Sequence, residues 1–327
     1  MHGTRRNKLL LSTLTASMLL ALTAQAAAED EPAAYRGSGA NLRTTVSALS
    51  FDEAAEPDYN PYVESTVDLR AMWWFTDWLN TSASMGFSRE LTESDITTQG
   101  GETWPSDLFL GVGFSRFANV RLLNIDLSGG LGAQLPVSPS SQARTLLVGV
   151  TPSLSGTRRF DLLGGLSLTY GYRATKYFHE YTTAERETPL ITSCASAGRG
   201  CEPYLNTGVR NVSWRQVHSG SVSLGLIDTL SVSVGTSVFI DTVYDGVQDE
   251  RISFVAQEPT DNRHSIAYNL GLSYSPMPSV SLGLGASTAN AQLAPDSTYR
   301  APFFNRNTTF YLDVGLDVAG LVSQVTP

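Results

Sequence analysis

The chain has 327 residues, of which 42% are hydrophobic and 16% charged, and its formal net charge is −9. This acidic balance argues against nucleic acid as a partner, because phosphate backbones are bound by basic surfaces. The acidic residues gather mostly in connecting stretches, at 29–31, 53–58 and 245–250. No Pro- or Ser-rich linker divides the chain, so we expect one large domain.

The first residues have the pattern of a secretory signal peptide. Arg5, Arg6 and Lys8 precede an apolar run over 9–22 and a small-x-small sequence at 24–26. This order of segments predicts cleavage after Ala26, with Ala28 as the alternative site. Residues 1–26 are then the signal peptide and 27–40 a short periplasmic segment. No later stretch reaches the roughly 18 apolar residues of a membrane helix. The exported chain is therefore either soluble or a barrel.

The remainder repeats segments in which apolar residues alternate with Ser, Gly, Thr and Asn. In one of them, Val280, Leu282 and Leu284 alternate with Ser281 and Gly283. A period of two indicates a β-strand with one apolar face. The pattern predicts twelve strands, in chain order at 41–51, 62–74, 79–89, 107–117, 120–136, 145–155, 162–178, about 212–226, 230–240, 264–274, 280–289 and 308–318.

The connections between these segments alternate in length. Short turns fall near Asp77, Ala118, Arg158, Asp228 and Pro276, whereas the other connections are longer and polar, the longest spanning 179–211. An even strand number with short turns on one side and long loops on the other is typical of bacterial membrane barrels. We therefore predict an all-β fold: a transmembrane antiparallel up-and-down β-barrel over 41–318, with periplasmic turns, extracellular loops and a C-terminal tail at 319–327. An exported β-sandwich or β-helix is the alternative, but a sandwich usually carries more charge on its outer face.

Aromatic residues near the strand ends, such as Trp73, Trp78, Trp214 and Tyr244, suit the headgroup layers. With this feature added, the whole mature chain resembles the porin-like outer-membrane β-barrels of Gram-negative bacteria, and no particular family is indicated. The resemblance implies a location in the outer membrane, contact with its lipid bilayer and insertion by the barrel-assembly machinery. Such barrels commonly end on an aromatic residue that this machinery reads, whereas this chain ends on Pro327. The sequence is compatible with a monomer.

The two cysteines of the chain, Cys194 and Cys201, lie in the longest loop. In an oxidising compartment they are expected to form a disulfide, with two independent thiols as the alternative. A metal site is less well supported, because no second pair and no nearby His accompanies them. No phosphate loop, paired zinc ligands or GxSxG motif occurs, so we expect no cofactor.

The non-apolar strand face is the predicted lumen wall, and its few charges are the candidate pore-lining residues. If twelve strands enclose more space than such small side chains fill, water remains inside and the barrel is a pore. We expect the acidic members to share one wall, where they would favour cations, with Arg70 and Arg173 as counter-charges. A balanced salt-bridge network that only stiffens the wall is an equal alternative. The candidates are Glu64, Asp68, Arg70, Asp126, Arg173, Asp313 and Asp317.

These features predict a channel for passive diffusion of small hydrophilic solutes, weakly cation-preferring. One alternative is a hydrolase at the outer rim, and its candidate residues are His179, His218, His264, Ser219, Asp241, Asp245 and Asp261. Their types suit acid–base and nucleophilic chemistry, but no known triad spacing is matched. A further alternative is a non-transporting surface anchor or adhesion barrel, which small inward residues disfavour.

Overall fold

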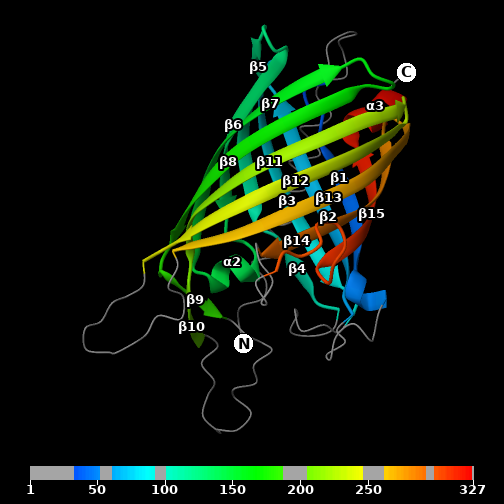
Figure 1. Ribbon diagram of the computed structural model, residues 1–327. Coiled ribbons are helices and arrows are strands. Elements are labelled where there is room, and N and C mark those ends of the chain that lie inside the picture. The colour runs from blue at the N-terminus through cyan, green and yellow to red at the C-terminus, as the bar shows by residue number, and fades with distance from the viewer. Residues whose placement is uncertain are drawn as a thin grey trace, which may run out of the picture.

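The computed structural model describes residues 33–51, 61–92, 101–186, 205–245, 261–291 and 298–325, which form a closed barrel (Figure 1). The predicted cleavage site at Ala26 and the pair Cys194 and Cys201 lie outside these residues. The predicted twelve-strand antiparallel barrel is confirmed. Its strands are β1 (Gly39–Ser47), β2 (Val63–Trp74), β3 (Leu79–Glu90), β5 (Leu108–Val120), β6 (Ile125–Leu135), β7 (Leu146–Phe160), β8 (Leu166–His179), β11 (Val212–Ile227), β12 (Leu230–Val243), β13 (Asn262–Met277), β14 (Val280–Ala291) and β15 (Thr308–Asp317).

Each barrel strand pairs with the next one along the chain, and the last pairs with the first. The closing ladder between β1 and β15 runs from Gly39 opposite Asp317 to Ser47 opposite Thr309 without a bulge. Closure gives every strand two neighbours, so the backbone groups of the strands are satisfied within the sheet.

Six shorter elements sit at the two ends of the barrel. At the end with the long connections lie η1 (Ala48–Phe51), β4 (Thr103–Pro105), α2 (Pro139–Ala143), β9 (Thr183–Arg186) and β10 (Leu205–Arg210), and α3 (Val318–Val325) lies at the end with the short turns (Figure 1). No helix among the described residues is long and apolar enough to cross a bilayer. The first strand is shorter than predicted, because 48–51 form a 3₁₀ turn.

The C-terminal residues differ from the predicted tail, because 318–325 are helical. The Asp317 carboxylate accepts a hydrogen bond from the Gly320 backbone N–H (2.7 Å), which caps the first turn of α3. The Val318 N–H donates to the Ser38 carbonyl (2.9 Å), which ties the start of the helix to the chain just before β1. The strand therefore ends at a capping carboxylate.

The barrel has an apolar outside and no packed apolar interior. Leu131, Leu284 and Leu312 are 53%, 57% and 53% exposed, as outward side chains in a lipid-facing band would be. Among the described residues, buried apolar side chains are limited to Leu146, Val217, Val243 and Tyr311, and a longer set of buried side chains is polar. A soluble sandwich would instead bury its apolar faces between two sheets.

Candidate functional site: the lumen wall

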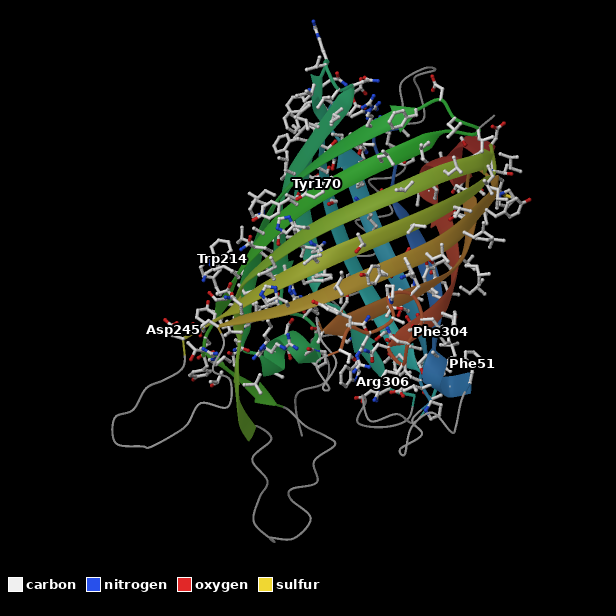
Figure 2. The ribbon with its side chains drawn as sticks, in the orientation of Figure 1. Phe51, Tyr170, Trp214, Asp245, Phe304 and Arg306 are labelled. Atoms are coloured by element: carbon white, nitrogen blue, oxygen red, sulfur yellow. The ribbon has the colours of Figure 1, made fainter. Side chains whose placement is uncertain are left out.

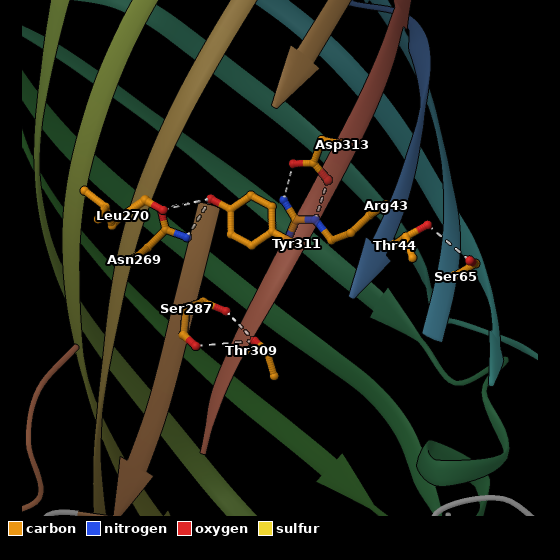
Figure 3. Close-up of polar contacts among 9 residues, drawn as sticks. All are labelled: Arg43, Thr44, Ser65, Asn269, Leu270, Ser287, Thr309, Tyr311 and Asp313. Atoms are coloured by element: carbon orange, nitrogen blue, oxygen red, sulfur yellow. Dashed lines mark hydrogen bonds and ion pairs between the residues drawn. The ribbon is translucent and has the colours of Figure 1, made fainter. Parts of the chain in front are cut away.

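An ion pair across the closing seam identifies the inner face. Arg43 on β1 and Asp313 on β15 lie opposite each other, and Arg43 Nε and Nη2 donate to Asp313 Oδ1 and Oδ2, both at 2.7 Å (Figure 3). Residues directly opposite in the ladders share a face, and alternate residues along a strand do too. The neighbouring Leu42 and Leu312 are exposed and belong to the outer face.

The ring of Tyr311 packs against the Arg43 side of this ion pair. The guanidinium of Arg43 lies over the Tyr311 ring, with 4.4 Å from Cζ to the centroid, a cation–π geometry. Asn269 Nδ2 donates to Tyr311 Oη (3.1 Å) from two strands away (Figure 3). The ring reaches that far because it crosses Gly285, where any β-carbon would collide with the Tyr311 hydroxyl. The ring lies flat along the wall and is 8% exposed.

A second cluster of charges lies on β11, β12 and β13. Arg215 Nε and Nη2 donate to Asp241 Oδ1 and Oδ2 at 2.6 and 2.7 Å. Arg263 lies directly opposite Asp241 on its other side. On β8, Arg173 lies opposite Val217 of the same inner face. Guanidinium groups therefore outnumber carboxylates on this part of the wall.

A third ion pair lies at the short-turn end of β6 and β7. Asp126 accepts hydrogen bonds from Asn119 Nδ2 (2.8 Å) and Arg159 Nη1 (2.5 Å). Asp126 therefore has a direct cationic partner, which the sequence analysis did not assign to it.

Three of the predicted pore-lining residues remain exposed on the inner face. They are Asp68, Arg70 and Arg173, and no hydrogen bond or ion pair joins their side chains to another described residue. Asp68 and Arg70 line an open cavity of about 620 Å³, together with residues of β1, β15 and the turn between β13 and β14. Exposure of charges inside a closed barrel means that water reaches them there.

The other two candidates lie at the strand ends. Glu64, near the long-connection end of β2, lies opposite Glu90 of β3. Asp317, at the opposite end, caps α3 and also lines the cavity. Glu64 and Asp68 lie on β2, and Asp313 and Asp317 lie on β15; these two strands flank β1 on either side. Asp126 and Arg173 lie elsewhere on the barrel.

Several inward charges were not predicted from the sequence, although their positions in the alternating pattern indicated their direction. Arg43 lies between Leu42 and Thr44 in the first predicted strand, and if Leu42 points outward, the alternation of a strand points Arg43 inward. Arg159, Arg215, Asp241 and Arg263 lie near strand ends, where the apolar alternation weakens and the face is harder to assign.

The outer mouth contains a buried carboxylate that anchors a connection. Asp107, just before β5, is 6% exposed and accepts hydrogen bonds from Gln134 Nε2 (2.5 Å), the Val137 and Ser138 N–H groups (3.0 and 2.8 Å) and Ser141 Oγ. Burial acts to raise the pKa of Asp107, but the hydrogen bonds from Ser141, Gln134 and Ser138 outweigh it and hold the pKa below its ordinary value. This carboxylate fixes the segment that contains α2.

The rim residues of the hydrolase hypothesis are not brought together. His218 faces outward, and its Nδ1 is 2.8 Å from the Tyr170 hydroxyl. Tyr170 lies on the outer surface of the barrel (Figure 2). Ser219, its neighbour in the strand, faces inward. Asp241 binds Arg215, and His179 Nδ1 lies 2.7 Å from the Arg144 carbonyl.

The remaining members of that set are equally separate. His264 lies opposite Ile240, on the outer face. Asp261 accepts a hydrogen bond from Arg210 Nη1 (2.8 Å), and Asp245 is exposed at the end of the chain segment after β12 (Figure 2). The described side chains therefore do not form a serine–histidine–aspartate arrangement.

Comparison with known proteins places the fold but not a family. No protein-family model matches the chain, and no curated protein matches its sequence. Among solved structures, the COG4313 outer membrane channel from Pseudomonas putida F1 is 11% identical with a TM-score of 0.52, covering 90% of this chain and 100% of that one. The translocator domain of the autotransporter NalP from Neisseria meningitidis (10% identity, TM-score 0.44, 94% and 96% covered) and the KdgM porin in complex with disordered oligogalacturonate (9%, 0.43, 85% and 98%) are more distant.

The chain thus has the fold of a porin-like outer-membrane β-barrel. This fold supports embedding in the lipid bilayer of the outer membrane. At these identities the likeness concerns the fold alone.

Proposed function

We propose that this protein is a passive outer-membrane channel for small hydrophilic solutes. The observation that carries the proposal is the exposure of Asp68, Arg70 and Arg173 on the inner face of a closed barrel. A charge inside an unfilled interior must be hydrated, because burying it without a partner is costly. A barrel that served only as an anchor would be expected to fill this space with larger side chains.

The paired charges limit how strongly such a channel would select ions. Asp313 is neutralised by Arg43 and Asp126 by Arg159, so these two carboxylates belong to a stiffening network. The weak cation preference that we propose rests on Asp68 and Glu64 on β2. We therefore assign the stiffening salt-bridge network to the paired carboxylates and the cation preference to the carboxylates of β2.

The proposal also includes the steps that bring the barrel to its membrane. We infer export through a signal peptide at 1–26, insertion by the barrel-assembly machinery and a disulfide between Cys194 and Cys201. The oxidising conditions outside the cytoplasm favour that bond.

Single-channel recording of the refolded protein in a planar lipid bilayer tests the proposal. Stable current steps whose size rises with salt concentration are expected of a wet lumen. A barrel that is folded, as judged by circular dichroism and heat-modifiable migration, but never conducts would contradict it.

A further inference from the structure

Phe109 interrupts the alternation of apolar and small residues on β5. The strand begins with Leu108, Phe109 and Leu110, so three large apolar residues follow one another. Because successive side chains of a strand point to opposite faces, Phe109 does not share the outward face of Leu108 and Leu110. One large apolar ring therefore belongs to the polar side of this strand.

The strand ladders place the Phe109 side chain in the lumen. Phe109 lies directly opposite Ser84 of β3 and Gln134 of β6, and Ser84 in turn lies opposite Arg70 of β2. Residues opposite one another in a ladder share a face, and Arg70 is on the inner face. The ring therefore points inward near the outer mouth, two residues after the buried Asp107.

The Phe109 ring is left open to the lumen. Phe109 is 45% exposed, whereas Tyr311, which is also on the inner face, is 8% exposed because it lies flat over Gly285. A large apolar side chain stabilises the fold by leaving water, and Phe109 forgoes much of that stabilisation. Packing of the wall therefore does not account for a phenyl ring at this position.

A second ring lies on the other side of Gln134. Tyr177 of β8 is directly opposite Gly149 of β7, and Gly149 is directly opposite Gln134. A β-carbon at Gly149 would lie 3.2 Å from the Tyr177 ring and 3.3 Å from Gln134 Cβ, so the glycine leaves the space into which the ring extends. Phe109 and Tyr177 thus flank Gln134 on one short stretch of the inner face.

The Gln134 carboxamide between the two rings is held in place. Its Nε2 donates to Asp107 Oδ2 (2.5 Å), and the same carboxylate is fixed by the backbone N–H groups of Val137 and Ser138. The carboxamide oxygen makes no hydrogen bond to another residue that the structure describes. It therefore remains an acceptor for a donor group of a solute.

Aromatic rings attract other rings in offset-stacked or edge-to-face arrangements, which an aliphatic group does not reproduce. We propose that Phe109, Gln134 and Tyr177 form a weak binding site at the outer mouth for small hydrophilic solutes that carry an aromatic ring, with a donor group of the solute directed to Gln134 Oε1. Phe109 determines the specificity, because its ring is the exposed one. This inference rests on the proposed channel function, since the lumen is the route by which solutes reach the ring.

Saturation-transfer NMR on the refolded protein in micelles of an aliphatic detergent measures the binding. L-phenylalanine and L-leucine are the probes, because both are zwitterions and they differ in the aromatic or aliphatic nature of the side chain. We expect the half-saturating concentration of L-phenylalanine to be about threefold lower than that of L-leucine, the scale of one aromatic pair. Empty micelles give the background for each probe.

Variants at position 109 separate the ring from the apolar bulk. Phe109→Leu and Phe109→Ser remove the ring and should bind the two amino acids equally, whereas Phe109→Tyr keeps the ring and should keep the threefold difference. Phe87→Leu removes an outward ring of β3 that is 41% exposed, and it should also keep the difference. All four variants should unfold at wild-type urea concentrations, because neither ring is buried.

Equal binding of the two amino acids by wild-type protein would overturn the inference. So would a difference that persists in both variants without the ring at position 109, or one that Phe87→Leu loses as well. Osmotic swelling of proteoliposomes in the same two amino acids tests the channel function separately. A folded wild-type barrel that passes neither of them would overturn that function, whereas passage of both without any difference in binding would overturn only this inference.

Discussion

The cluster around Arg43 and the mid-strand residue Asp68 lie on adjacent strands, but their charged groups differ in environment. The Arg43 guanidinium is paired within the wall, whereas the Asp68 carboxylate is exposed to the lumen. At the seam, Asp313 and Tyr311 hold the Arg43 guanidinium on two sides. Asp68 lies on the next strand with its carboxylate over Gly86 and exposed to the lumen. A charge whose hydrogen bonds are made within the wall contributes to stability, whereas a hydrated one remains able to act on passing solutes.

Among these predictions, the largest loss of stability is expected when a methyl group is added at Gly285, next to the cluster around Arg43. In Gly285→Ala the new β-carbon collides with the Leu270 carbonyl oxygen and with the Tyr311 ring, so both must shift, and we expect a loss of about 1–3 kcal/mol in the free energy of unfolding. Urea unfolding in lipid vesicles measures it. Gly235→Ala is the matched control, because the nearest atom to its β-carbon is 3.8 Å away. Equal losses of stability in the two variants would show that the Tyr311 ring does not depend on the space over Gly285.

Removing the carboxylate of the ion pair should have a smaller effect. Asp313→Asn leaves Arg43, which is 43% exposed, without its anionic partner, and we expect a loss of about 1–2 kcal/mol. Asp68→Asn should change stability by less than about 0.5 kcal/mol, because its carboxylate is hydrated. A double-mutant cycle with Arg43→Gln checks the assignment. Additive losses at Arg43 and Asp313 would mean that the pair contributes nothing.

The buried carboxylate at the mouth should show a pH dependence. Because the pKa of Asp107 is lowered in the folded state, its contribution is present above the unfolded value of about 4 and is lost as the pH falls through the folded value. The protection factors for hydrogen exchange at 137–141 should be high at pH 7 and fall under strong acid. Asp107→Asn should already show fast exchange at pH 7, by about tenfold for a loss near 1.4 kcal/mol. Unchanged exchange in this variant would argue against the anchoring role.

The smallest effect is expected at the outward histidine. His218→Leu removes a lipid-facing ring that contacts Tyr170 and Tyr172, so conductance and ion selectivity should stay at wild-type values. Planar-bilayer recording checks this, with His218→Gln as the polar control. A clear change in selectivity would place His218 in the lumen and would contradict the assigned faces of β11.

Much of the lumen wall could be predicted from alternation, and its failures have local causes. Asp68, Arg70 and Arg173 lie in mid-strand, flanked by regular apolar positions, and the structure places them on the inner face. Arg215, Asp241 and Arg263 lie toward the strand ends, where polar residues occupy both faces. Asp317 follows the strand pattern, but its carboxylate caps α3, and a short helix of Val, Ala and Leu after a strand leaves no distinctive signal.

The sequence by itself determined the strand number, the order of the strands and the sidedness of the connections. These follow from the period of two and from turn length, which are local properties of the chain. Only the tertiary structure decided which charges meet. Arg43 and Asp313 are separated by most of the chain, and the register at closure brings them together. A shift of one residue in that register would move every side chain of the strand to the other face, so the partners are set by the ladder.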